Sequence, residues 1–109
     1  MKIITILFHG ELGVNMHTIF KYQIPVQEKF TLDLPDGANI IRVEDVDGMF
    51  FMWAMVDTEK ELTKRYFECY KTGMPIITDP SKLKFLGTCK LFVMQELCLY
   101  VFEVVDMTV

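Results

Sequence analysis

The chain has 109 residues, enough for one domain whose core needs no disulfide or metal to hold it together. Its net charge is −4, its pI is about 5.1 and it has no basic tract, so general binding to nucleic acid or to an anionic membrane is disfavoured. Hydrophobic residues make up 51% of the sequence, which predicts burial beyond the interior of one small subunit.

The cysteines and histidines exclude two kinds of site. Cys69, Cys89 and Cys98 are odd in number and form no Cys-x-x-Cys pair, so we expect reduced, mostly buried thiols in a cytoplasmic protein. His9 and His17 are the only histidines, which excludes a multi-histidine metal centre. We therefore expect no metal and no cofactor.

Residues 1–15 are separated from a single β domain predicted for residues 16–109. Their apolar run, from Ile3 to Phe8, is too short for a signal peptide or a membrane helix. Two interpretations stay open. The segment is either an extra strand that covers an exposed sheet face or a leader translated from an early start codon, since a well-formed strand follows Met16 directly.

The first strands of the β domain are bounded by proline. Residues 18–24 alternate between polar and apolar side chains and stop at Pro25. Residues 28–34 alternate again and end at Pro35-Asp36-Gly37, a typical turn sequence. Both segments are therefore predicted to be half-buried strands.

Residues 39–57 are predicted to form a hairpin. Asp47-Gly48 favours a type I′ turn between the alternating segment 40–46 and the apolar run 49–56. A helix over 49–56 is the alternative, because short apolar runs are ambiguous. As a strand, this run has two apolar faces, one with Phe50, Met52, Ala54 and Val56 and the other with Met49, Phe51, Trp53 and Met55.

The second half of the chain predicts three more strands. Thr58–Glu61 has the form of a helix capping box, but we favour a loop followed by a strand over 64–71, with at most one helical turn at 59–62. A proline-containing loop leads to strands over 84–93, with Gly87 as a candidate bulge, and 97–105. About seven strands predict a mainly β fold, an antiparallel sandwich or a small barrel.

The sequence contains no recognised catalytic motif, so we expect a protein that is not an enzyme. Asp45, Asp47 and Asp57 gather around one hairpin and would suit a cation or acid–base chemistry. Their positions in turns are the simpler explanation.

One set of residues is a candidate ligand site. Aromatic rings, positive charge, a hydroxyl and a glycine turn would suit a nucleotide-like or phosphorylated ligand. The set is Trp53, Arg65, Tyr66, Tyr70, Lys71, Thr72 and Gly73. The alternatives are that Trp53 fills the core and that the others belong to a solvated edge strand. Because two strands have no polar face, we also expect a homo-oligomer.

Short motifs between residues 16 and 103 carry a resemblance to known proteins. They are Thr18-Ile19-Phe20-Lys21-Tyr22, Leu34-Pro35-Asp36-Gly37-Ala38, Met52-Trp53-Ala54-Met55-Val56-Asp57, Tyr70-Lys71-Thr72-Gly73-Met74-Pro75-Ile76, Phe85-Leu86-Gly87-Thr88 and Tyr100-Val101-Phe102-Glu103. With them the chain resembles a family of short proteins of unknown function encoded mainly by bacteriophages and prophages. The family's loop usually reads Tyr-Gly-Thr-Gly-His-Pro-Ile, and here Lys71 and Met74 replace the first glycine and the histidine. Any role of that histidine does not carry over.

The resemblance implies a viral origin and a β-rich fold. On that analogy we expect a phage accessory protein that acts by binding in the host cytoplasm, as an oligomer that sequesters a nucleotide-derived immune signal. The alternative is a protein-interaction or structural module whose apolar sheet face meets a host or virion protein.

Overall fold

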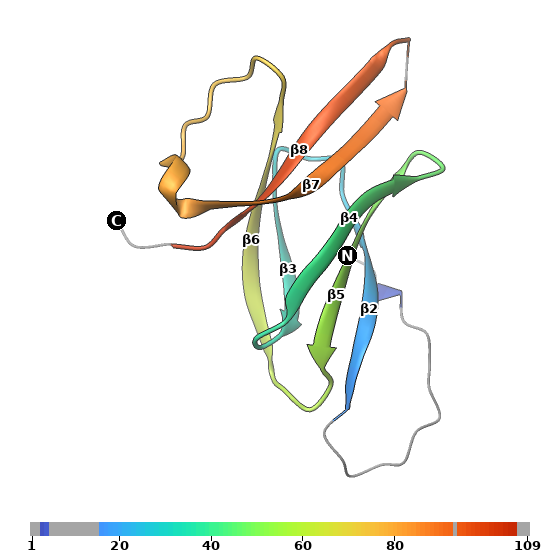
Figure 1. Cartoon of the computed structure of the whole chain (residues 1–109), viewed down its shortest axis with the longest axis vertical. Helices are drawn as coiled ribbons and strands as arrows, with labels where there is room; N and C mark the ends of the chain where they lie inside the picture. Colours follow the sequence, from blue (N-terminus) through green and yellow to red (C-terminus); the bar gives the residue numbers. More distant parts are fainter. Residues whose placement is uncertain (1–2, 5–15, 93, 107–109) are drawn as a thin grey trace.

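The computed structural model of the chain describes residues 3–4, 16–92 and 94–106. The fold is mainly β, as predicted, and two four-stranded antiparallel sheets pack as a sandwich that does not close into a barrel (Figure 1). The described strands are β1 (Ile3–Ile4), β2 (His17–Ile24), β3 (Lys29–Pro35), β4 (Asn39–Val46), β5 (Met49–Asp57), β6 (Leu62–Lys71), β7 (Leu83–Phe92) and β8 (Glu96–Val104).

The two sheets have different strand orders. Sheet A has the order β1-β2-β5-β4, and sheet B has the order β3-β6-β8-β7. In sheet A, the two-residue strand β1 pairs with Tyr22 and Lys21 at the edge of β2. Residues 1–2 and 5–15 lie outside the described residues, so the choice between the two interpretations of the N-terminal segment stays a prediction.

The predicted turns form for the expected reason. Asp47 and Gly48 have φ angles of 52° and 78°, and two successive positive values define the type I′ turn that joins β4 to β5. At the β3–β4 turn, the Ala38 N–H donates to the Pro35 carbonyl at 3.0 Å, and Gly37 has a φ of 76°. Glycine provides that positive φ without steric cost.

The core lies between the inner faces of the two sheets. Phe50, Met52, Ala54 and Val56 of β5 are all buried there, so the strand prediction for this run is confirmed and the helical alternative is wrong. Sheet B contributes alternate residues of β3 and β6, and the rings of Phe30 and Phe67 stack with their centroids 5.1 Å apart. Each large apolar side chain that is fully buried contributes about 1.5–3 kcal/mol.

The sheets approach each other closely where β4 meets β7. A Cβ added to Gly87 would lie 3.1 Å from the Val43 Cβ, so glycine allows the contact. The register of β7 against β8 shifts between Phe85 and Gly87, which confirms the predicted bulge. The Lys90 N–H donates to the Asp45 Oδ1 at 2.7 Å and links the two sheets.

The ambiguous segment after β5 is a turn followed by a strand, as we favoured. β6 begins at Leu62, and the one helical element among the described residues is the 3-10 turn η1 (Pro80–Lys82), which Asp79 caps. Within residues 3–4, 16–92 and 94–106, no helix has the length and apolar character needed to span a membrane.

Candidate functional site

The outer face of sheet A carries the second apolar side of β5. Met49 and Met55 are 46% and 45% exposed at its two ends. Phe51 lies between them and is only 4% exposed, although it points away from the core. One part of this face is therefore sealed within a single chain and another part is open.

Two cations cover the aromatic residues in the middle of this face. Strand register places Lys21 of β2 and Arg42 of β4 on either side of Trp53. The Lys21 Nζ lies 4.1 Å from the ring centroid of Phe51 and 5.5 Å from that of Trp53, and the Arg42 Cζ lies 4.3 Å from the Trp53 centroid. These distances are typical of cation–π contacts. We call Lys21, Trp53 and Arg42 the Trp53 row.

The charge balance of the Trp53 row is uneven. The Arg42 Nε donates to the Glu44 Oε2 at 2.7 Å, so an exposed carboxylate partly neutralises the positive charge of Arg42. Lys21 has no carboxylate partner among the described ion pairs. The row therefore presents positive charge beside a partly exposed indole ring.

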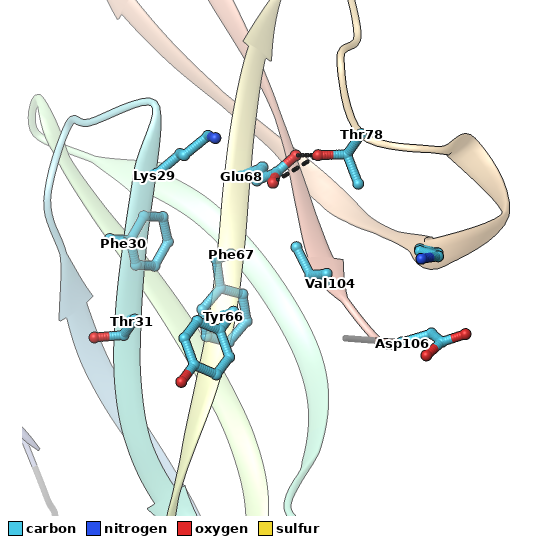
Figure 2. Close-up of a pocket in the computed structure, with 10 residues that line it drawn as sticks. Lys29, Phe30, Thr31, Tyr66, Phe67, Glu68, Thr78, Val104 and Asp106 are labelled. Carbon is cyan, nitrogen blue, oxygen red and sulfur yellow. Dashed lines mark hydrogen bonds between the residues drawn. The ribbon is translucent and has the colours of Figure 1, made fainter. Parts of the chain in front are cut away.

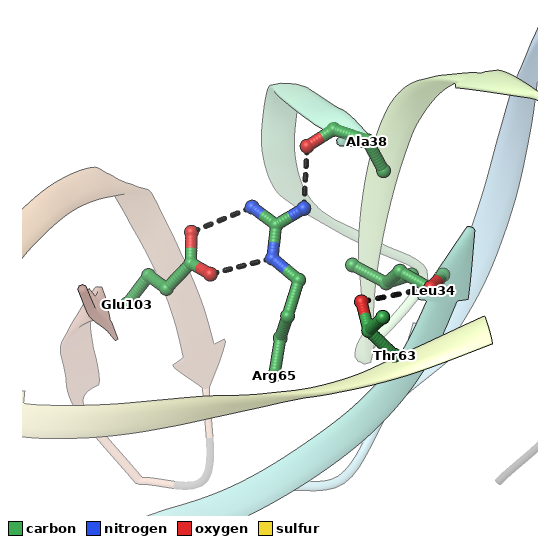
Figure 3. Close-up of polar contacts among 5 residues, drawn as sticks. All are labelled: Leu34, Ala38, Thr63, Arg65 and Glu103. Atoms are coloured by element: carbon green, nitrogen blue, oxygen red, sulfur yellow. Dashed lines mark hydrogen bonds and ion pairs between the residues drawn. The ribbon is translucent and has the colours of Figure 1, made fainter. Parts of the chain in front are cut away.

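The other predicted ligand residues lie on sheet B and do not join Trp53. Arg65 of β6 points into the interior, where its Nε and Nη2 donate to the two Glu103 carboxylate oxygens at 2.6 and 2.8 Å (Figure 3). Its Nη1 donates to the Ala38 carbonyl. Arg65 thus ties β6 to β8 and to the β3–β4 turn.

Tyr66 and Tyr70 project from the outer face of sheet B. The Tyr70 hydroxyl donates to the Glu68 carboxylate, and burial together with this hydrogen bond raises the pKa of Tyr70. Tyr66 lines a pocket of about 460 Å³ that also includes Glu68, Thr78 and Lys29 (Figure 2).

The last three predicted residues form the end of β6. The Met74 N–H donates to the Lys71 carbonyl at 3.1 Å, and Gly73 has a φ of 83°, as a type II turn requires. The hydroxyls of Thr72 and Tyr100 lie 3.4 Å apart. Lys71 lines a separate pocket of about 150 Å³, so the predicted set is distributed over several places.

The three aspartates around the β4–β5 hairpin have structural roles. Asp47 forms the turn, Asp57 accepts the Glu59 N–H at 3.0 Å, and Asp45 accepts the Lys90 N–H. In the part of the chain that the structure describes, no group of three or more His, Cys, Asp or Glu side chains could hold a metal ion.

The three cysteines are unpaired, and two of them are buried. Burial raises the pKa of Cys69 to about 11. For Cys89, burial and the neighbouring Asp45 carboxylate raise the pKa to about 12. Since the thiolate is the reactive form, neither residue is suited to be a nucleophile.

Sequence reasoning missed the flanking cations Lys21 and Arg42, and also Glu68. The available signal for the cations was one positively charged residue in each of the predicted strands 18–24 and 40–46. For Glu68 it was a carboxylate two residues from a tyrosine on each side, which places all three on one strand face.

Comparison with known families assigns the chain to a group. Residues 16–108 match the domain of unknown function DUF7352. The chain belongs to this family. No curated protein and no solved structure matches the DUF7352 chain significantly.

Proposed function

We propose that this DUF7352 protein is a non-catalytic phage accessory protein that sequesters a nucleotide-derived immune signal in the host cytoplasm. The observation that carries the proposal is the Trp53 row, where two cations and an indole share one surface. The proposed site is on sheet A and includes Trp53 from the predicted ligand set. Lys21 and Arg42 take the place of the predicted residues that lie on sheet B.

The chemistry of the row suits a planar anion. An indole ring stacks on any nucleobase, and such stacking is worth about 1–3 kcal/mol per base. Lysine and arginine form charge-assisted hydrogen bonds with phosphate oxygens. Arg42 can exchange its exposed contact with Glu44 for a phosphate, because exposed ion pairs contribute little.

The resemblance to phage and prophage proteins supports the proposed biological setting. A protein that lowers the concentration of a messenger needs binding residues but no group that breaks a bond. Association of subunits through the open parts of the sheet A face would place two Trp53 rows near each other. This arrangement would suit a ligand with two bases or two phosphates.

Fluorescence of Trp53, the only tryptophan, tests the proposal directly. Titration with cyclic dinucleotides, cyclic mononucleotides and ADP-ribose should change its emission for at least one of them. Lys21→Gln and Arg42→Gln should each weaken that binding by about tenfold, the equivalent of one charge-assisted contact. Lys60→Gln, in the exposed β5–β6 turn, is the matched control and should bind normally.

Two outcomes would contradict sequestration. One is the absence of any emission change and any thermal shift with all of these nucleotides. The other is a bound ligand that is chemically altered when it is recovered after denaturation, since that result would indicate an enzyme.

A protein-interaction module is the second candidate, and a specific observation favours it. Ile19 and Met55 are register partners on the outer face of sheet A and are both about half exposed. With Met49 they give this face apolar side chains that another protein could cover. This module should show no thermal shift with nucleotides and should retain one host or virion protein in a pull-down that Met55→Glu abolishes.

The oligomer is tested separately by light scattering on the intact chain. We expect a mass that is a multiple of 12.7 kDa at micromolar concentration, reduced to one subunit by Met55→Glu. A wild-type protein that scatters as a single subunit would remove the subunit-pairing part of the proposal.

A further inference from the structure

Sheet B contains two buried carboxylates whose partners differ. Glu68 and Glu103 are 8% and 6% exposed. Glu103 forms a bidentate ion pair with Arg65, which neutralises its charge inside the sandwich. Glu68 takes part in none of the ion pairs that the described residues form.

Neutral hydroxyl groups hold the Glu68 carboxylate in place. The Thr78 hydroxyl lies 2.8 and 2.9 Å from its two oxygens (Figure 2). The Tyr70 hydroxyl also donates to one of them. These contacts fix the carboxylate but do not cancel its charge. A buried charge held only by neutral hydroxyl groups is costly, so a cation that contacted Glu68 directly would be favoured.

The space next to Glu68 is large enough for a small molecule. The pocket has a volume of about 460 Å³, within the usual range for ligand sites. Tyr66 and Thr31 line it together with the charged residues Lys82 and Asp106, and Lys29 lies directly opposite Glu68 in the β3–β6 register. A carboxylate and an ammonium group therefore face one cavity from neighbouring strands.

We infer that this pocket binds a small zwitterion whose ammonium or guanidinium group contacts Glu68 and whose anionic group contacts Lys29. The cation of the ligand neutralises the buried carboxylate, and the Tyr66 ring offers it a cation–π surface. Lys29 is exposed and flexible enough to meet the anion. This site is on the opposite sheet from the Trp53 row, and the inference does not depend on the proposed function.

Two probes that differ by one carboxylate test the inference. L-arginine carries both charges, and agmatine is the same molecule without the carboxylate. Isothermal titration of the intact chain should show saturable binding of L-arginine. Glu68→Gln should weaken binding of both probes by about tenfold or more, the effect of a charge-assisted contact. Lys29→Gln should weaken the binding of L-arginine by a similar factor and leave the binding of agmatine unchanged or tighter.

Two controls check that the fold is kept and separate this site from the Trp53 row. Glutamine at position 68 still offers an oxygen to Tyr70 and Thr78, so circular dichroism should show an unchanged β fold. Arg42→Gln should leave L-arginine binding unchanged. The inference would be overturned if the wild-type chain bound neither probe at millimolar concentration, or if Glu68→Gln bound both as tightly as the wild type.

Discussion

Replacing Glu103 with leucine tests how much the buried ion pair of sheet B contributes to stability. The side chains of Arg65 and Glu103 are 20% and 8% exposed, so little solvent screens them. Leucine preserves the approximate volume but removes both acceptors. The Arg65 guanidinium then keeps the Ala38 carbonyl as its described partner.

The expected loss is large for a chain of this size. Two charge-assisted hydrogen bonds are broken and one buried charge loses its counterion, which together cost about 3–5 kcal/mol. A domain of 109 residues has a free energy of unfolding of about 5–15 kcal/mol. Glu103→Leu therefore removes between about a fifth and all of the free energy of unfolding.

Urea denaturation followed by Trp53 fluorescence measures this loss, and two variants act as controls. Glu44→Leu breaks the exposed pair with Arg42 and should cost at most about 1 kcal/mol. The double variant Arg65→Met with Glu103→Leu replaces both charges and should recover most of the stability. If Glu103→Leu cost no more than Glu44→Leu, the buried pair would not stabilise the sandwich in the way argued.

Two further predictions concern the core and its cysteines. Gly87→Ala places a Cβ 3.1 Å from the Val43 Cβ and 3.2 Å from the Val43 carbonyl oxygen. The substitution should therefore lower the free energy of unfolding, measured by urea denaturation, by about 1–3 kcal/mol. An unchanged urea midpoint would contradict the tight β4–β7 contact. The pKa of Cys69 rises from 9.0 to about 11, and that of Cys89 rises to about 12. Unfolded thiols lose their protons first, so the free energy of unfolding should fall as the pH rises from about 9 towards these values. In Cys69→Ala the free energy of unfolding should fall less steeply with pH. A slope equal to that of the wild type would contradict the raised pKa of Cys69.

Local sequence signals predicted the strands of this fold well. The Asp47-Gly48 turn depends on two adjacent residues that accept positive φ, and the alternation in 28–34 depends on the two-residue period of a strand. The bulge at Gly87 was also predicted from a local signal, a glycine inside a strand. The second bulge, between Ile40 and Arg42, was missed because no glycine marks it.

The candidate sites were harder to predict because they depend on pairing between distant segments. Trp53 and Arg65 were grouped from residue type alone, but the sheets place them on different surfaces. Lys21 and Arg42 reach Trp53 only through the register of three strands. The Glu68 pocket also needs Thr78, which the β6–β7 loop brings back over sheet B (Figure 2).

The contact between Asp45 and Lys90 has a consequence for how molecules can assemble. β7 is the terminal strand of its sheet, and an exposed terminal strand invites pairing with another polypeptide. Here a side-chain oxygen from the opposing sheet already occupies one backbone donor of β7. An incoming strand would have to displace it to form a continuous ladder. The Asp45–Lys90 hydrogen bond thus disfavours the edge-to-edge addition of further chains to β7 and the fibrils that such addition would build.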